Sequence, residues 1–514
     1  MTKTAMRYTN WGLSMLVGIG IFLFWYLAYP HALSYQEQYQ LFLWTWDYFL
    51  ERISLPGGLA DWLGEFIVQF YYLEWLGALL LALLFIALQR LTAKLLPNGF
   101  WCLFSLVPPP MLLWLMGDIN VLLSLPVAIV LSLALCTIRM PKQLSIADII
   151  IVPIAYWLIG PAVWIYVILR SLQWGWWRKE ESGKRKEEGG MWMAKGYRLL
   201  VIGYLLFVQL ATYAWLLPQW PLQMAMTGLN YYRIPLHYPQ LKGYDKDMYE
   251  LIRLDYLVRQ ERWDEIVHRA AAYQVHTPLW SNCVNLALAE KRLLADRMFD
   301  FYQSGEDALI IPRTRDLTSM LPSAEAFWRL GMVNSALRYM FDTQEAILNA
   351  RSSGRCTKRI AECMIVNGHY KTATKQTALL RKSLFYRCWA EEAERLMKDE
   401  KKINAHPVYG RLRQLRYKDS FLYNYEEIDK MLGLLFQNNP QNKMALDYFM
   451  AQMLLKGNMQ GFVKYMGWVQ QYGGYRQMPL GYQDVMRCIQ AQGNVPGSPY
   501  AKYVKRMMER RNQP

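Results

Sequence analysis

The stretch FWRLGMVNSALRYMF, residues 327–341, sets a glycine turn between two segments with helical spacing of apolar residues. A turn followed by a hydrophobic residue recurs in ERWDEIV (261–267), KRLLADRMF (291–299), GHYKTATK (368–375) and GNMQGFVKYM (457–466). The matching positions are Trp263, Leu293, Val333, Tyr370 and Met459, spaced 30, 40, 37 and 89 residues apart, and the last interval leaves room for one degenerate pair around residues 412–435. Such periods are typical of stacked helix hairpins. Residues 219–514 are therefore predicted to form an all-α helical-repeat domain.

These repeats resemble tetratricopeptide repeats. The consensus Trp-Leu-Gly is complete at Trp328, Leu330 and Gly331, and Ala336 with Phe341 follows in the second helix. The resemblance implies an α-solenoid that docks partners. The residues expected at helix contacts in the core are Ala287, Ala295, Ala336, Ala373, Phe299, Phe341 and Phe462.

Residues 1–218 contain apolar runs of bilayer length and are predicted to form a transmembrane module. Seven spans are expected, at about 11–29, 73–89, 99–117, 119–138, two within 146–177 and one at 199–217. Gly160 and Pro161 are expected to divide the 146–177 run. Were that run to cross only once, the helical-repeat domain would lie in the cytoplasm.

The basic residues fix the predicted sides. Lys3 and Arg7 precede the first span, Arg90 and Lys94 follow the second, and the loop 178–190 is rich in Lys and Arg. The positive-inside rule then puts the N-terminus and that loop in the cytoplasm. With seven crossings, residues 219–514 are predicted to be extracytoplasmic.

The predicted extracytoplasmic domain is basic, with 42 Lys and Arg against 29 Asp and Glu. Such a surplus favours anionic lipid or acidic partners, and the predicted location makes nucleic acid an unlikely ligand. Three basic clusters, residues 351–359, 411–418 and 502–511, are either solvated helix faces or surfaces that line a repeat groove or rest on anionic lipid. The partner-binding candidates are Arg355, Arg359, Arg411, Arg413 and Arg416.

The first predicted extracytoplasmic loop, residues 30–72, holds five acidic residues and a single base, Arg52. A helical projection places Glu37, Gln40, Trp44, Asp47 and Glu51 on one face, and Asp61, Glu65 and Gln69 on one face of a second helix. Two amphipathic helices on the bilayer surface, joined at Pro56-Gly57-Gly58, are therefore expected. Their acids either face water or form the roof of an active site, for which Glu37 and Asp47 are the catalytic candidates.

The predicted arrangement of spans, first loop and appended domain resembles the GT-C class of glycosyltransferases. This resemblance implies a polyprenyl-linked sugar donor, a possible divalent metal, and Glu37 or Asp47 as general base or metal-site residue. The loop has no adjacent Asp-Asp, Asp-Glu or Asp-x-Asp pair, unlike that class.

The chain also resembles an uncharacterised family of multi-pass membrane proteins from Bacteroidota that ends in a tetratricopeptide-like region. The stretches that carry the likeness are YQEQYQLFLW, PGGLADWLGEF, RWDEIV, FWRLGMVNSALRYMF and FYRCWA. The likeness implies a bacterial inner membrane protein whose C-terminal domain faces the periplasm, and it implies no activity.

Two hypotheses of function follow. The first is a scaffold or assembly factor that displays the helical repeat to an envelope protein or glycan. The alternative is a GT-C-like glycosyltransferase. The sequence lacks GxxxxGK[ST], GxSxG and HExxH, so phosphate-loop, hydrolase-elbow and zincin mechanisms lose their usual support.

Overall fold

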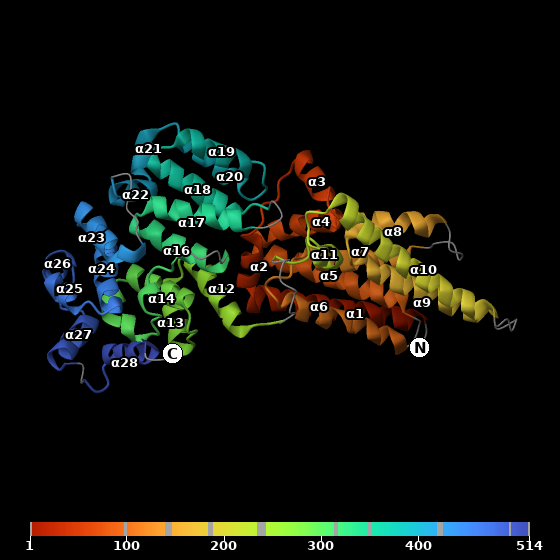
Figure 1. Ribbon diagram of the computed structural model, residues 1–514, viewed down its shortest axis with the longest axis horizontal. Helices are drawn as coiled ribbons and strands as arrows, with labels where there is room; N and C mark the ends of the chain where they lie inside the picture. The colour runs from red at the N-terminus through yellow and green to blue at the C-terminus, as the bar shows by residue number, and fades with distance from the viewer. Residues whose placement is uncertain are drawn as a thin grey trace. The chain divides into compact units, whose positions relative to one another are not determined.

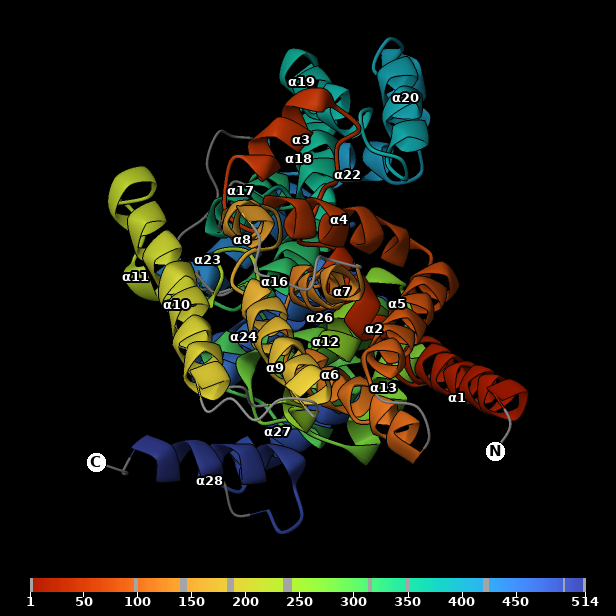
Figure 2. The ribbon, with the colours of Figure 1, turned by 90° about the vertical axis from the view of Figure 1, so that its right-hand side faces the viewer.

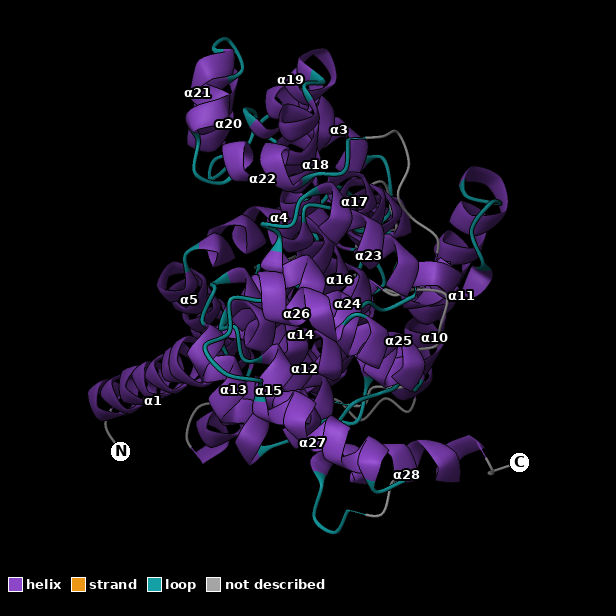
Figure 3. Ribbon diagram, turned by 90° about the vertical axis from the view of Figure 1, so that its left-hand side faces the viewer, coloured by secondary structure: helices purple, strands orange, loops and turns teal. Residues whose placement is uncertain are grey.

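The computed structural model describes residues 3–96, 100–138, 146–182, 189–233, 243–312, 317–347, 351–418, 425–492 and 495–511. These residues form helices and connecting turns and no β-strand, which confirms the all-α prediction (Figure 3). The chain divides into two compact units (Figure 1). The first unit comprises Met1–Asp245, Leu348–Arg351 and Lys382–Phe385, and the second comprises Lys246–Ile347, Ser352–Arg381 and Tyr386–Pro514.

The first unit holds eleven α-helices in its described residues. They are α1 (Lys3–Leu23), α2 (Pro30–Glu37), α3 (Trp46–Ile53), α4 (Gly58–Val68), α5 (Glu74–Leu95), α6 (Pro108–Met116), α7 (Ser124–Thr137), α8 (Ile146–Ile159), α9 (Val163–Ser182), α10 (Gly189–Ala211) and α11 (Leu222–Thr227). Helices α1 and α10 each end in a π-helical turn, at Phe24–Ala28 and Thr212–Leu216.

Among the described residues of the first unit, three helices are long and apolar enough to cross a membrane, namely Thr9–Ala28, Glu74–Leu95 and Leu199–Leu216. The prediction of seven such spans is wrong. The other predicted spans form shorter apolar helices, Leu103–Met116, Ser124–Thr137, Ile150–Ile159 and Val163–Leu172. Fourteen residues of α-helix extend about 21 Å, against a hydrocarbon core of about 30 Å.

The turn predicted at Gly160 is present. Helix α8 ends at Ile159, Gly160 has a φ of +89°, and α9 begins at Val163. A left-handed backbone favours glycine because it has no Cβ to clash with the carbonyl oxygen. The predicted charged loop, residues 178–190, includes the last residues of α9 and the first residues of α10. Residues 183–188 lie outside the described part of the chain.

The long helices α1 and α5 lie side by side (Figure 1 and Figure 2). A Cβ atom built on Gly18 would lie 2.5 Å from the Ile86 side chain, so glycine permits the close approach. Polar groups at this contact satisfy one another: Ser14 Oγ donates to Gln89 Oε1 (2.6 Å), and Gln89 Nε2 donates to Ser105 Oγ (2.8 Å). Small residues and hydrogen-bonded polar groups are typical of contacts between membrane helices.

One end of the first unit gathers four segments that are distant in sequence. Within the 30–72 segment, Gln36 Nε2 donates to Ile119 O (3.0 Å) and Gly57 N donates to Trp157 O (2.8 Å). The segment after α10 joins them through Leu122 N, which donates to Tyr231 O (2.9 Å). The α6–α7 turn and the α8–α9 turn therefore lie at the same end of the unit as residues 30–72.

The first unit extends to Asp245, beyond the predicted boundary at residues 218 and 219. Residues after α10 pack within this unit, since Leu217, Met224 and Leu229 form a buried apolar cluster. Tyr231 also contributes, because its hydroxyl donates to Ile159 O (2.5 Å).

The second unit is a succession of mostly short helices. They are α12 (Lys246–Arg259), α13 (Trp263–Ala272), α14 (Pro278–Glu290), α15 (Leu294–Arg297), α16 (Leu317–Leu330), α17 (Val333–Ala346), α18 (Gly354–Asn367), α19 (Tyr370–Leu380), α20 (Arg387–Leu396), α21 (Glu400–Ala405), α22 (Tyr409–Leu415), α23 (Ile428–Asn438), α24 (Lys443–Lys456), α25 (Met459–Lys464), α26 (Met466–Tyr472), α27 (Leu480–Gln490) and α28 (Pro499–Arg511).

Five turns between these helices share one geometry. Each has a left-handed residue two positions before the next helix begins, and the residue after it donates its N–H to the carbonyl five positions earlier. This is the hydrogen bond of a Schellman cap, which satisfies carbonyl groups at a helix end. The left-handed residues are Glu261, Arg292, Gly331, Gly368 and Gly457. Helices α13, α17, α19 and α25 begin at the predicted repeat positions, and α15 begins one residue after Leu293.

Most of the predicted helix-contact residues are in the core. Ala287, Ala295, Ala336, Ala373 and Phe462 are buried. Phe299 is only half-buried, and the prediction for Phe341 is wrong, because this ring is 37% exposed.

Candidate functional site

A pocket of about 430 Å³ lies in the second unit, between α16, α18, α20 and α22. We call it the Trp389 pocket. Its aromatic lining consists of Trp328, Trp389, His406 and Tyr409, and its charged lining consists of Glu261, Arg329, Arg359, Glu362, Glu392 and Arg411. A concave surface that combines aromatic rings with a few charged groups is typical of binding sites.

Helix α20 supplies one wall of this pocket. Trp389, Glu392, Ala393 and Leu396 follow the i, i+3, i+4, i+7 spacing that puts side chains on one helix face. Across the pocket, Pro407 and Val408 precede α22, and His406 stacks on Tyr409 with ring centroids 4.3 Å apart. His406 Nδ1 accepts hydrogen bonds from the backbone of Val408 and Tyr409, which holds this corner in place.

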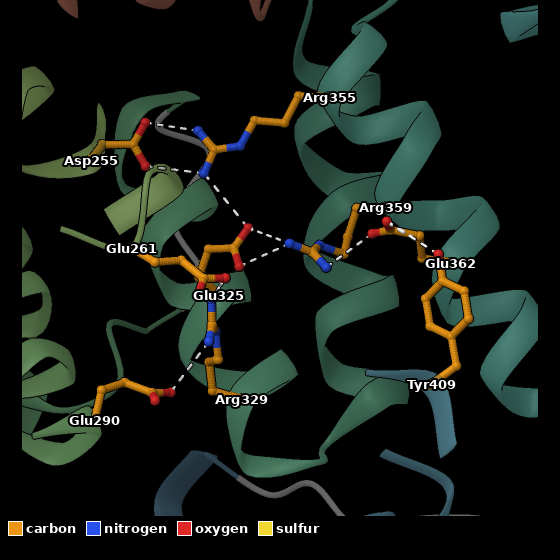
Figure 4. A network of polar contacts seen from close by, with 9 residues as sticks. All are labelled: Asp255, Glu261, Glu290, Glu325, Arg329, Arg355, Arg359, Glu362 and Tyr409. Carbon is orange, nitrogen blue, oxygen red and sulfur yellow. Dashed lines mark hydrogen bonds and ion pairs between the residues drawn. The ribbon is translucent and has the colours of Figure 1, made fainter. Parts of the chain in front are cut away.

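A continuous chain of ion pairs supports the floor of the Trp389 pocket (Figure 4). Arg355 binds Asp255 through two hydrogen bonds of 2.8 and 3.1 Å, and its second nitrogen lies 3.7 Å from Glu325. Arg359 then binds both oxygens of Glu325 (2.8 and 2.9 Å) and, with its other nitrogen, Glu362 (2.9 Å). Bidentate guanidinium–carboxylate pairs fix geometry as well as charge.

The two arginines stabilise the charged form of Glu325. Burial alone would raise the pKa of this carboxyl, but Arg359 and then Arg355 outweigh burial and lower the pKa to about 2. The Arg359 guanidinium also stacks over Trp328, 4.3 Å from the ring centroid. The floor of the pocket is therefore fixed before any partner binds.

The rim of the pocket carries charges that the protein itself does not neutralise. Arg411 on α22 and Glu392 on α20 are exposed, and neither forms a hydrogen bond or ion pair within the described part of the chain. By contrast, Arg329 is paired with Glu261 and lies 3.6 Å from Glu290. The unpaired groups, one of each sign, are free to meet a ligand.

The five predicted partner-binding arginines take different roles. Arg359 and Arg411 line the Trp389 pocket. Arg355 is buried against Asp255. Arg413 donates to Ile365 O (3.0 Å) and Val366 O (3.2 Å) at the end of α18, and Arg416 donates to Asn367 Oδ1 (3.1 Å). These last two bind the end of a neighbouring helix, as basic residues often do.

Of the aromatic and charged residues that line the pocket, only Arg359 and Arg411 were predicted from the sequence as site residues, and the aromatic residues and Glu392 are among those missed. The stretch FYRCWA carries Trp389, but a tryptophan at helical spacing is more often a core residue than a binding residue. The available signal was Glu392, three positions after Trp389 on the same helix face, because a charged side chain seldom lies next to a buried tryptophan ring.

The predicted catalytic candidates lie in different environments. Glu37 is buried, only 4% exposed, in the last turn of α2, whereas Asp47 is exposed in the first turn of α3. The expected single helical face from Glu37 to Glu51 is wrong, because the chain leaves α2 after Glu37 and is not helical again until Trp46. Among the described residues, no group of three or more His, Cys, Asp or Glu side chains is arranged to hold a metal ion.

The acids of the second predicted surface helix point inward. Asp61 and Glu65 of α4 are buried, while Trp62 and Phe66 on the same helix are partly exposed. Arg351 forms ion pairs with both acids, and its distance to Glu65 is 2.9 Å. Burial raises the pKa of Asp61, although the charge of Arg351 acts in the opposite direction. Of the two alternatives for these acids, a water-facing side of α4 is therefore wrong.

Three further groups complete this buried cluster. Arg52 Nε lies 3.1 Å from Glu65, and Ser124 Oγ donates to Asp61 Oδ1 (2.9 Å). Tyr48 also donates to Glu65. Because each acid has several partners, we infer that this cluster stabilises the fold of the first unit.

Comparison with known proteins identifies the family to which this chain belongs. Neither the curated proteins nor the solved structures contain a significant match. Residues 6–513 match the family of unknown function DUF6057, and because the match covers almost the whole chain, this protein belongs to that family.

Proposed function

We propose that this protein is a membrane-anchored docking protein whose second unit binds a partner protein in the Trp389 pocket. The observation that carries the proposal is the pairing of a fixed aromatic and ionic floor with unpaired charges at the rim. Binding surfaces that are already ordered lose less entropy on association. Trp, Tyr and Arg are also the residues that dominate binding energy at protein interfaces.

The chemistry of the pocket favours a peptide segment over a glycan. Glu392 and Arg411 offer one acceptor and one donor of full charge, which match a segment that carries both signs. Trp389 and Leu396 supply apolar area for a side chain of the same segment. A neutral glycan would leave both rim charges without a partner.

We further propose that the second unit lies on the extracytoplasmic side of a bacterial inner membrane. If the three long apolar helices of the described residues each cross the membrane, the N-terminus and the residues after α10 lie on opposite sides, because three is an odd number. Residues 30–72, between α1 and α5, would then lie on the same side as the residues after α10, and the hydrogen bond from Arg233 Nη2 to Gln36 Oε1 (2.8 Å) supports this arrangement. Lys3 and Arg7 favour a cytoplasmic N-terminus.

Exposed aromatic side chains support membrane anchoring of the first unit. Trp46 is 70% exposed on α3, and Trp75 is exposed in the first turn of the span α5. Trp44 and Leu50 are exposed beside Trp46. Tryptophan is enriched where membrane proteins meet the lipid headgroups, because its ring is apolar and its N–H is polar.

A photocrosslinking experiment tests the docking proposal. A photoreactive phenylalanine analogue replaces Val408, which is exposed at the pocket rim, in the full-length protein in its native membrane. We expect a discrete protein adduct after irradiation. The additional change Trp389→Ala should remove the adduct, because loss of an interface tryptophan costs about 2 kcal/mol or roughly 30-fold in affinity.

Two controls make the result specific. The same analogue at Leu480, which is exposed in α27 of the same unit and does not line the pocket, should give no such adduct. Charge reversal by Arg411→Glu should also weaken the Val408 adduct. An adduct that survives Trp389→Ala, or that forms equally from Leu480, would contradict the proposal.

A further inference from the structure

One buried cation in the first unit has no anionic partner. Arg233 is 8% exposed and follows Tyr232, which pairs with Val121. Its backbone N–H donates to Asn120 O (2.7 Å), so the residue is held at the end of the unit where residues 30–72 meet the α6–α7 turn.

The side chain of Arg233 is positioned by α2 and the residues after it. Its Nη2 donates to Gln36 Oε1 (2.8 Å), and its guanidinium lies over the rings of Tyr35 and Tyr39, 4.7 and 4.2 Å from their centroids. Gln36 is itself fixed by donating to Ile119 O and Val121 O. Nothing in this arrangement supplies a negative charge.

Two nitrogen atoms of Arg233, Nε and Nη1, are buried and have no hydrogen-bond acceptor in the described structure. No carboxylate of the described residues pairs with it, unlike Arg52, Arg351 and Arg355, which are buried as deeply and each bind an acid. An arginine stays protonated in proteins, and a buried charge without a counter-ion costs several kcal/mol.

The surroundings of Arg233 add positive charge. Burial lowers the pKa of Arg233, the two tyrosines act in the opposite direction, and the nearby Arg351 lowers it further. Both acids of the neighbouring cluster, Asp61 and Glu65, are already bound by Arg351. The charge of Arg233 is therefore the one that an anion would neutralise at this end of the unit.

We propose that Arg233, with Gln36 and the rings of Tyr35 and Tyr39, forms a binding site for a phosphate group. Guanidinium groups match phosphate oxygens in both charge and geometry. The phosphate belongs either to a lipid headgroup or to a free anion. Because Nε and Nη1 are buried, entry of the ligand requires a flanking tyrosine ring to move. This site is separate from the Trp389 pocket and does not depend on the docking proposal.

The test measures thermal unfolding of the full-length protein in an uncharged maltoside detergent. The two probes are inorganic phosphate and short-chain dioctanoyl phosphatidate. We expect at least one probe to raise the melting temperature in a saturable manner, since ligands that bind only the folded state stabilise it. Phosphate alone would identify a free anion as the ligand, and phosphatidate alone a lipid headgroup.

The variant Arg233→Gln should lose the response to the probe while its melting temperature without probe stays equal to that of the wild type or rises. That second readout separates a ligand site from a structural role, because a structural arginine would lower the baseline when removed. Arg395→Gln, an exposed arginine of the second unit, should keep the full response.

A third variant covers the case in which Arg233→Gln does not fold. Arg233→Lys keeps the charge but removes the planar fork, and we expect its half-saturating probe concentration to rise about ten-fold. The proposal is overturned if neither probe shifts the wild-type melting temperature, if Arg233→Gln retains the shift, or if Arg233→Lys binds as tightly as the wild type.

Discussion

Two buried acids of the second unit show how burial and neighbouring arginines compete to set the charge state of a side chain. Glu325 lies between Arg359 and Arg355, and its pKa falls to about 2. Asp447 has a single arginine, Arg292, and here burial prevails and raises the pKa to about 6. At Asp447 the single guanidinium does not compensate for desolvation of the carboxylate, whereas at Glu325 the surrounding arginines do.

This difference predicts opposite effects of neutralising the two acids. A lowered pKa means that ionised Glu325 stabilises the fold fully above about pH 4.5 and progressively less as the pH falls toward 2. Glu325→Gln should therefore reduce the free energy of unfolding at pH 7 by about 3 kcal/mol. A raised pKa means that ionised Asp447 opposes folding as the pH rises through about 6, so Asp447→Asn should be neutral or stabilising at pH 7.

Urea unfolding of the full-length protein in detergent, followed by tryptophan fluorescence, measures both variants. The deficit of Glu325→Gln should persist at pH 5 and shrink below pH 4. Equal losses for the two variants at pH 7 would show that the arginines around Glu325 do not stabilise its ionised form more than Arg292 stabilises that of Asp447.

At this scale the sequence predicted which arginines are clustered but not what they bind. Arg355 and Arg359 lie in one basic run, which is usually a solvated face. Arg355 forms its ion pair with Asp255, which lies 100 residues earlier in the chain, so no local spacing relates the two residues. Arg233 was missed for the converse reason, since its distinction is the absence of a nearby carboxylate in the fold.

At the scale of elements, the recurrent turns carry the most accurate part of the sequence analysis. Turn residues and the hydrophobe two positions later are a local signal, because a left-handed residue ends one helix and fixes where the next begins. The first-loop helices could not be predicted as well. Spacing shows which residues share a helix face, but Arg351, which draws Asp61 and Glu65 inward, comes from much later in the chain.

The shared turns allow a matched pair of glycine substitutions. Gly331 and Gly368 have nearly equal φ values of +84° and +80°. A Cβ on Gly331 would lie 2.8 Å from Leu415 Cβ, whereas a Cβ on Gly368 would meet nothing within 4 Å. Gly368→Ala should cost about 1–2 kcal/mol for the left-handed backbone alone, and Gly331→Ala about 1–3 kcal/mol more for the clash. The same urea unfolding experiment compares them, and equal losses would show that Leu415 yields without cost.

At the scale of the whole molecule, hydropathy located the apolar segments but overcounted those long enough to span a bilayer. Between Phe100 and Met116, for example, a 3₁₀ segment and the prolines Pro108, Pro109 and Pro110 divide a run that is continuously apolar in sequence. Composition does not show where such a run stops being one helix. The parity of the predicted crossings is nevertheless the same for three long spans as for seven.

The side of the membrane that the second unit occupies is tested by one native cysteine. Cys388 on α20 is exposed, whereas Cys136, Cys283, Cys356, Cys363 and Cys488 are buried. A maleimide that passes the outer membrane but not the inner membrane should label the protein in intact cells, and Cys388→Ser should abolish that labelling. Labelling that requires lysis of the inner membrane would place the second unit in the cytoplasm. In that case the docking proposal would need a cytoplasmic partner, and the assignment of residues 30–72 to the outer side would be wrong as well, since both follow from the same count of crossings.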